Sequence, residues 1–163
     1  MTAKRIAIVL IDEFADWELG LFAAAARSWL GASVDHYTPG GRVVRSMGGL
    51  SVTPEAALED LVLEDFDALA VIGSSGWEAP DAPDVGPILR AALLAERPVG
   101  AICGGTLAAA QAGVLRQRRH TSNAADYLRD RVPDYDGTLY VETPRAVIDG
   151  GLVTAPGSAP ASF

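Results

Sequence analysis

The sequence predicts an α/β domain in which helices flank both faces of a mostly parallel sheet. Short apolar runs rich in β-branched residues recur along the chain, and such runs are typical of strands buried on both faces. Helical periodicity separates these runs, which indicates βαβ units. The chain has 163 residues, of which 49% are hydrophobic, enough for one core. We therefore expect a single doubly wound, three-layer domain over residues 1–163.

The first part of the chain contains two expected strands and one helix. Residues 4–11, KRIAIVLI, form a continuous apolar run of the buried-strand type. Residues 16–30 place large apolar side chains at helical spacing, and Gly31 follows as a stop signal. Residues 33–39 are predicted as the second strand, and the glycine-rich residues 40–54 as a hairpin or excursion.

The middle of the chain repeats this alternation of strand and helix. Residues 67–72, DALAVI, are predicted as a buried strand that ends in the sequence GSSG, and residues 85–96 as a helix. Residues 99–102, VGAI, form the next expected strand, and a helix begins directly after Cys103. In the last third, Ser122 or Asn123 can cap the start of a further helix. Three short strands are expected after it, at residues 138–143, 145–151 and 152–157.

Composition excludes several classes of function. The formal net charge of −8 argues against nucleic acid or an anionic membrane as a partner. The N-terminal apolar run is too short for a signal peptide, and no run is long enough to span a membrane. One cysteine and two histidines argue against a disulfide and a metal cage, and no phosphate-binding glycine motif occurs. We expect a cytoplasmic protein with a small-molecule substrate and no metal or other cofactor.

The single cysteine, Cys103, lies between a buried strand and a helix, in the sequence ICGGT. Ligands of open parallel sheets bind at the carboxyl ends of the strands, where residues 12–18 and 73–76 are also expected. A nucleophile on such a turn needs small neighbours, which Gly104 and Gly105 provide, and the following helix favours the thiolate. The alternative is a buried cysteine that only fills the core. The strand–Cys–Gly–Gly–helix setting favours the nucleophile.

Three segments of the chain resemble the ThiJ/PfpI superfamily: IDEFADWEL (11–19), DALAVIGSSGWEAP (67–80) and AICGGTLAAAQAGVLRQRRHTSN (101–123). That superfamily contains the parkinsonism-associated deglycase, PfpI-type peptidases and relatives of the class I glutamine amidotransferase domain. The resemblance extends from about Lys4 to Phe163. It implies a flavodoxin-like three-layer α/β/α sandwich, a homodimer, and Cys103 as the cysteine of a nucleophile elbow.

By this resemblance, the glutamate that follows the first strand falls on Glu18. A protonated Glu18 can donate a hydrogen bond to the Cys103 thiolate, which stabilises the thiolate and raises the pKa of the carboxyl group. The alternative for Glu18 is an ordinary carboxylate in the first turn of a helix. Family members commonly have a Pro-Gly-Gly turn where this chain has Ile72, Gly73 and Ser74. An amide of this turn, together with that of Gly104, can form an oxyanion hole, or the turn has no catalytic role.

The histidine of the family has no clear counterpart. In PfpI-like peptidases a histidine directly follows the cysteine, where this chain has Gly104. His120 is the candidate base, but if Thr121 matches the family's threonine, Asn123 takes the histidine's place and His120 faces away. Without a histidine, acyl transfer lacks a proton shuttle, whereas addition to an activated carbonyl or oxidation of the sulfur needs only a thiolate.

The end of the sequence departs from the family in one respect. The motif resembling APGSAPASF opens a final helix in family members, and this chain stops at Phe163. We therefore expect the final C-terminal helix to be absent and the apolar surface left behind to favour self-association.

Taken together, these features predict a cysteine-dependent hydrolase or lyase of the ThiJ/PfpI type. Its expected substrate is a small carbonyl, amide or glycated compound. The expected catalytic residues are Cys103, Glu18 and His120, and the expected oxyanion or substrate-binding residues are Gly73, Ser74 and Gly104. Two alternatives stay open: a redox-responsive stress protein whose cysteine is oxidised, and a non-catalytic amidotransferase-like domain.

Overall fold

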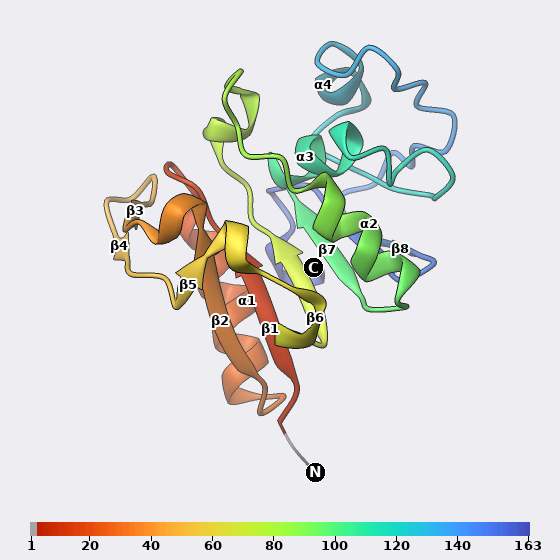
Figure 1. The fold of residues 1–163 in the computed structure, drawn as a ribbon. Helices are drawn as coiled ribbons and strands as arrows, with labels where there is room; N and C mark the ends of the chain where they lie inside the picture. The colour runs from red at the N-terminus through yellow and green to blue at the C-terminus, as the bar shows by residue number, and fades with distance from the viewer. Residues whose placement is uncertain (1–2) are drawn as a thin grey trace.

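The computed structural model describes residues 3–163 and places one seven-stranded sheet at the centre of the molecule (Figure 1). The strands are β1 (Arg5–Val9), β2 (Ser33–Thr38), β5 (Ala56–Ala57), β6 (Ala68–Val71), β7 (Val99–Ile102), β8 (Val147–Asp149) and β9 (Leu152–Ala155). They lie in the order β5-β2-β1-β6-β7-β9-β8. Every neighbouring pair is parallel except β8 and β9, so the predicted, mostly parallel sheet is confirmed.

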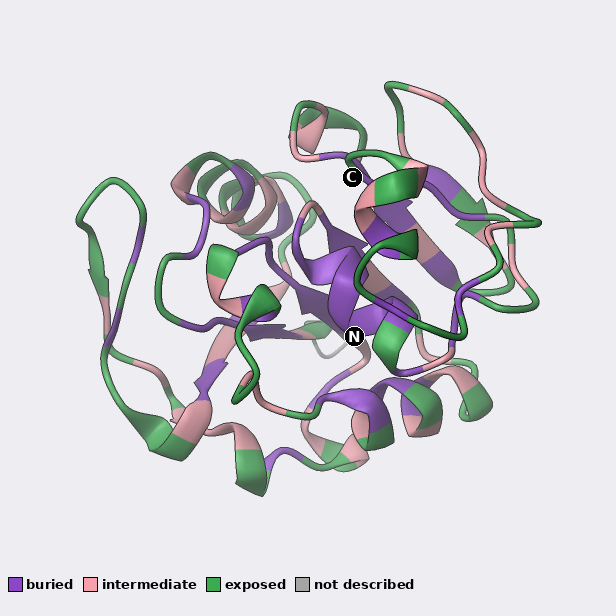
Figure 2. Ribbon diagram, turned by 90° about the horizontal axis from the view of Figure 1, so that it is seen from above, coloured by how far each residue is buried: buried purple, intermediate pink, exposed green. Residues whose placement is uncertain are grey.

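Helices cover both faces of this sheet. Helix α1 (Asp16–Ser28) packs on one face, and α2 (Gly86–Leu94) and α3 (Gly105–Gln111) pack on the other. The first apolar run serves both layers, because Ala7 and Val9 join the core under α2 and α3 while Ile8 and Leu10 join the core under α1. Figure 2 shows the buried strands in the middle and the exposed outer sides of the helices. The expected flavodoxin-like sandwich is therefore confirmed.

Short elements connect these layers. Strands β3 (Val44–Arg45) and β4 (Ser51–Val52) form the predicted antiparallel hairpin, and α4 (Ala125–Arg129) follows α3. The 3-10 turns are η1 (Pro39–Gly41), η2 (Leu58–Asp60), η3 (Leu63–Asp65), η4 (Ser75–Glu78) and η5 (Pro160–Ser162). Phe163, after η5, packs against Phe22 of α1 with ring centroids 5.2 Å apart. No helix among residues 3–163 combines the length and apolar character needed to cross a membrane.

Two local predictions are wrong. Residues 138–143 form no strand, and only Tyr140 makes an isolated bridge, with His120. The residue before α4 is Ala124, and neither Ser122 nor Asn123 caps this helix. Their side chains instead bind groups near the end of β7: the Ser122 hydroxyl lies 2.6 Å from that of Thr106, and Asn123 contacts Cys103.

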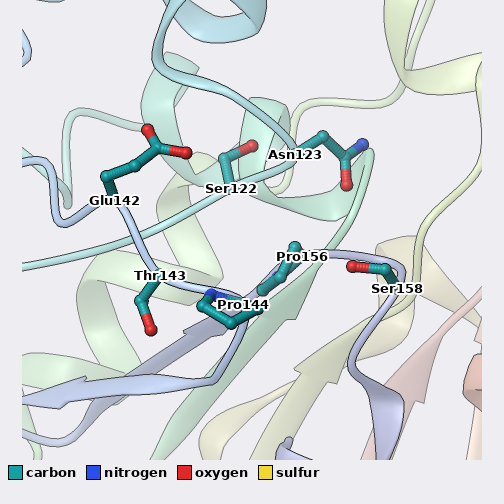
Figure 3. Close-up of a pocket in the computed structure, with 7 residues that line it drawn as sticks. All are labelled: Ser122, Asn123, Glu142, Thr143, Pro144, Pro156 and Ser158. Carbon is teal, nitrogen blue, oxygen red and sulfur yellow. The ribbon is translucent and has the colours of Figure 1, made fainter.

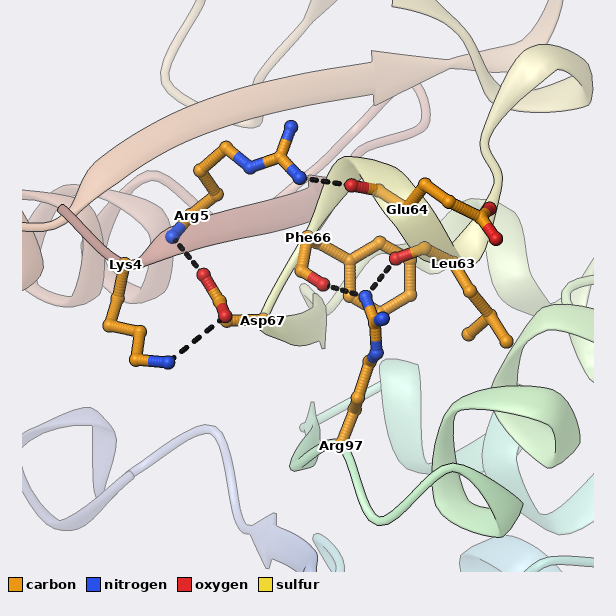
Figure 4. Close-up of polar contacts among 7 residues, drawn as sticks. All are labelled: Lys4, Arg5, Leu63, Glu64, Phe66, Asp67 and Arg97. Carbon is orange, nitrogen blue, oxygen red and sulfur yellow. Dashed lines mark hydrogen bonds and ion pairs between the residues drawn. The ribbon is translucent and has the colours of Figure 1, made fainter. Parts of the chain in front are cut away.

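Polar contacts hold the loop before β6 at the amino ends of the strands (Figure 4). Asp67 accepts hydrogen bonds from the Lys4 ammonium at 3.1 Å and from the Arg5 amide at 2.8 Å. The Arg97 guanidinium donates to two backbone carbonyls of the loop and lies over the Phe66 ring, 5.6 Å from its centroid. These contacts fix the amino ends of the strands, and the candidate site lies at their carboxyl ends.

Candidate active site

Cys103 lies on a tight turn between β7 and α3. Its φ of +54° is in the left-handed region, which a residue with a side chain adopts only at a cost in energy. The turn also needs glycines, because a Cβ on Gly104 would lie 2.4 Å from the carbonyl oxygen of Ser74. A Cβ on Gly105 would lie 2.4 Å from the carbonyl oxygen of Val71. The sulfur is therefore presented above the sheet by the strained strand-to-helix turn that the sequence predicts.

Glu18 reaches this turn from the first turns of α1. Its side chain is fully buried, with 0% exposure, and its Oε2 accepts a hydrogen bond from the Gly73 amide at 2.8 Å. Its Oε1 accepts no hydrogen bond from a nitrogen or oxygen donor among residues 3–163, and the carboxyl group contacts the sulfur of Cys103. Burial raises the pKa of Glu18 to about 7, although the Gly73 amide acts in the opposite direction. The carboxyl group can therefore hold or release a proton near neutral pH.

Two glycines enclose the pair formed by Cys103 and Glu18. A Cβ on Gly73 would lie 2.6 Å from the Cys103 Cβ and 2.6 Å from Glu18 Oε2. A Cβ on Gly157 would lie 2.7 Å from the Cys103 Sγ and 2.9 Å from Glu18 Oε1. Both sets of distances are shorter than side-chain atoms tolerate, so the contact between thiol and carboxyl group exists because these positions lack side chains. Sequence reasoning identified Gly73 but missed Gly157.

Asn123 is the other polar group at the sulfur. Its Nδ2 donates to the Cys103 Sγ at 3.3 Å, and its Oδ1 accepts a hydrogen bond from the Gly157 amide at 2.9 Å. Because the Gly157 amide requires an acceptor, the Asn123 amide cannot flip, and its NH₂ group faces the sulfur. The Trp17 indole donates to the Gly157 carbonyl at 3.0 Å and holds this loop from α1.

His120, the predicted base, is not brought to the sulfur. The residue is 2% exposed, with Nδ1 2.7 Å from the Arg118 carbonyl and Nε2 2.8 Å from the Tyr135 hydroxyl. Burial lowers its pKa and favours the neutral ring. The structure thus corrects the assignment of His120 to the site and selects the other register, in which Asn123 faces Cys103.

The ionisation of Cys103 also differs from the expectation. Burial raises the pKa of the thiol, and the negative charge of Glu18 raises it further, while hydrogen bonds from Asn123 and the Gly104 amide act in the opposite direction. Loss of water around the sulfur therefore outweighs the donors at the start of α3. Since two negative charges in contact repel each other, the pair of Cys103 and Glu18 carries one charge more readily than two.

Two of the groups predicted for an oxyanion hole make other contacts. The Gly73 amide is not available, because it donates to Glu18. The Ser74 hydroxyl is used within its own turn, donating to the Asp12 carbonyl at 2.5 Å and accepting from the Gly76 amide at 2.9 Å. The Ser74 amide lies against Gly104, whose Cβ would be 3.1 Å from it. The Gly104 amide hydrogen-bonds to the Cys103 sulfur and the Ser74 amide lies beside Gly104, so a role for these two amides in binding an oxyanion stays a prediction.

A pocket of about 300 Å³ lies beside Asn123 (Figure 3). Its lining residues are Ser122, Asn123, Glu142, Thr143, Pro144, Pro156 and Ser158. Asn123 belongs to both the pocket and the sulfur site, and Pro156 and Ser158 flank Gly157, so the pocket adjoins the sulfur site. Among residues 3–163 no group of three or more histidine, cysteine or acidic side chains is arranged to hold a metal ion.

A cysteine on a strained turn, a buried carboxyl group in contact with it, and a parallel sheet that presents both at its carboxyl edge define a nucleophile-elbow α/β protein with a cysteine centre.

The chain belongs to the DJ-1/PfpI family, whose sequence model matches residues 4–163. It is 46% identical to the DJ-1 superfamily protein Atu0886 from Agrobacterium tumefaciens, with a TM-score of 0.92 over 98% of this chain and 85% of that one. It is 33% identical to a ThiJ/PfpI family protein from Bacillus anthracis, with a TM-score of 0.89 over 100% of this chain and 80% of that one. A Bacillus subtilis protein named "Uncharacterized protease YoaZ" is 33% identical over 100% of this chain and 81% of its own length.

Proposed function

We propose that this protein is a cysteine-dependent hydrolase or lyase that acts on a small activated carbonyl compound, such as a 2-oxoaldehyde. The observation that carries the proposal is the environment of the Cys103 sulfur. Its titratable partner is Glu18, and an asparagine rather than a histidine faces it from the other side. Chemistry that needs a thiolate and one carboxyl group fits this arrangement best.

The reaction starts when the Cys103 thiolate attacks the aldehyde carbon of the 2-oxoaldehyde. A carbon–sulfur bond forms, the carbonyl electron pair moves to oxygen, and the amides of Ser74 and Gly104 stabilise the oxyanion before Glu18 protonates it. The Glu18 carboxylate then removes the hydrogen on the former aldehyde carbon as a proton and returns it to the neighbouring carbon, while the hydroxyl proton passes from the first oxygen to the former ketone oxygen. The result is a thioester of a 2-hydroxy acid. Water cleaves this thioester, releasing the acid and restoring the thiol.

Hydrolysis of an amide fits the site less well, although two curated relatives of this chain are named uncharacterized proteases. A leaving amine must receive a proton as the C–N bond breaks, and the amide of Asn123 cannot supply one. Glu18 would then have to serve both the nucleophile and the leaving group. An aldehyde has no leaving group, so a single carboxyl group is enough.

The proposal is tested by incubating the protein with phenylglyoxal and measuring mandelic acid. The wild type is expected to turn over many times, and Cys103→Ala, purified in the same way, is expected to form no product. His120→Ala is a matched control that changes a buried residue outside the sulfur site and is expected to keep turnover. Product formation by Cys103→Ala, or a wild type that stops after one equivalent, would contradict the proposal.

One observation favours oxidation of Cys103 as a second candidate. The Glu18 carboxyl group and Asn123 Nδ2 both contact the sulfur, and both can hydrogen-bond to oxygen atoms bound to it. Hydrogen peroxide would transfer one oxygen to the thiolate and leave as water, and a second equivalent would give the sulfinic acid. This candidate predicts a mass gain of two oxygen atoms at Cys103 after brief peroxide exposure, without turnover of phenylglyoxal.

A further inference from the structure

The pocket beside Asn123 has no part in the reaction proposed above. It adjoins the sulfur site through Asn123, which both donates to Cys103 and lines the pocket. Its volume of about 300 Å³ is at the lower end of the range for small-ligand sites. A compound bound covalently at Cys103 would have to pass the Asn123 side chain to reach this space.

The polar groups of the pocket are mostly engaged already. The Ser122 hydroxyl is paired with that of Thr106, the Thr143 hydroxyl accepts from the Arg145 amide at 3.3 Å, and both ends of the Asn123 amide are used. Pro144 and Pro156 supply rigid walls without N–H groups. Among the lining side chains, the hydroxyl groups of Thr143 and Ser158 are therefore the donors left for a ligand.

Glu142 and Ser158 are the polar lining side chains without a partner among the described residues. Within residues 3–163, neither forms an ion pair, and neither hydrogen-bonds to another residue. Figure 3 shows Glu142 on one side of the pocket and Ser158 on the other, with Pro156 between them. No lysine, arginine or histidine lines the pocket, so Glu142 is its single charged group.

We propose that this pocket is a substrate subsite for a positively charged group, an ammonium or guanidinium attached to the carbonyl compound, with Glu142 as the specificity-determining residue. A cation there gains the attraction of the carboxylate and can donate to Ser158, whereas an anion meets the same carboxylate with no basic partner. The assignment rests on the proposed function for its use in turnover, because the subsite serves a carbonyl compound held at Cys103.

The subsite is tested first without turnover, by labelling the single cysteine with three methanethiosulfonate reagents. These carry a trimethylammonium-ethyl, a sulfonatoethyl or a methyl group. In each case the Cys103 thiolate attacks the sulfenyl sulfur, a disulfide forms and methanesulfinate leaves. Rates are followed by intact mass and divided by the rate of each reagent with 2-mercaptoethanol. The variants are Glu142→Gln and, as a matched control, Glu64→Gln, which removes an exposed carboxylate before β6 at the opposite edge of the sheet.

The wild type is expected to prefer the cationic reagent over the anionic one. Glu142→Gln should lower this preference roughly three- to tenfold, and high salt should do the same, as expected for one carboxylate near the reagent in a partly solvated pocket. Glu64→Gln should leave the preference unchanged. An equal preference in wild type and Glu142→Gln, or an equal loss in both variants, would overturn the assignment.

A second measurement separates this inference from the proposed reaction. Turnover of phenylglyoxal is compared with turnover of its 4-aminomethyl derivative in wild type and Glu142→Gln. Turnover without a preference for the cationic compound overturns the subsite alone. A cationic preference in labelling together with no turnover of either compound supports the subsite and overturns the reaction.

Discussion

The buried carboxyl group of Glu18 should make the protein less stable as the pH rises from acidic to neutral. Burial raises the pKa of Glu18 from 4.5 to about 7 in the folded protein. Between these two values the folded state holds a proton that the unfolded state has lost, so each pH unit lowers the free energy of unfolding by about 1.4 kcal/mol. Across the whole interval the loss is about 3 kcal/mol, complete above pH 7 and absent below pH 4.5.

Glu18→Gln removes this dependence while keeping the shape of the side chain. The side-chain carbonyl of the introduced glutamine can still accept the Gly73 hydrogen bond, which leaves its NH₂ group facing the sulfur. The free energy of unfolding in urea is measured for both proteins over a range of pH. The variant is expected to match the wild type at low pH and to exceed it by about 3 kcal/mol above pH 7.

The difference in the free energy of unfolding between the wild type and Glu18→Gln reports the contribution of Glu18 alone, without that of the other carboxyl groups. Asp16 and Asp67 have pKa values lowered chiefly by hydrogen bonds, so they make the folded state more stable as the pH rises. They are present in both proteins and cancel in the comparison. Curves that stay parallel from acidic to neutral pH, or a variant that loses stability relative to the wild type as the pH rises, would refute the reasoning.

Three further predictions concern the site and its supports. In Gly157→Ala the new methyl group would lie 2.7 Å from the Cys103 sulfur. Alkylation by iodoacetamide, followed by intact mass, should therefore slow by more than about tenfold in a protein that still folds. An unchanged rate would show that the loop moves freely. In His120→Ala the buried Tyr135 hydroxyl loses its partner, so urea unfolding should show a loss of about 2–4 kcal/mol while alkylation stays unchanged. Slower alkylation would return His120 to the site. Arg97→Ala loses two hydrogen bonds to backbone carbonyls, and thermal unfolding should show a loss of about 2 kcal/mol without an effect on the sulfur.

The sheet and the elbow could be predicted because their signals are local. Residues 4–11, 67–72 and 99–102 are continuous apolar runs, and each contains a buried parallel strand. Two glycines follow Cys103 and mark the turn. Side chains at these two positions would clash with the backbone of neighbouring segments. Short runs that must be apolar on both faces leave little choice of structure.

The partner of the sulfur could not be predicted in the same way, because a shift of one residue exchanges the two faces of an extended segment. The register of this segment is set by a contact from its Thr121 amide to the Thr154 hydroxyl at 2.9 Å, far away in the sequence. The same long-range packing placed Asn123 on the sulfur instead of at the start of α4.

Gly157 and Glu142 were missed because neither carries a local signal. Gly157 comes into contact with Cys103 and Glu18 only when β9 pairs beside β7. Glu142 lies in residues 138–143, whose apolar residues predict a strand that the structure lacks. A single glycine or glutamate in such a segment looks like any other loop residue until the sheet is assembled.

Asn123 at the sulfur also limits how many protons the side chains of this site can exchange. A histidine in that place would gain and lose a proton in the neutral range, whereas an amide side chain keeps its hydrogens at every pH the protein survives. The Cys103 sulfur and the Glu18 carboxyl group therefore exchange one proton with solvent in the neutral range. In the proposed reaction, each cycle must return that proton before the next begins, and any second proton has to come from water. Acidification that leaves both the sulfur and the carboxyl group protonated would slow the proposed reaction directly, without any change in the fold.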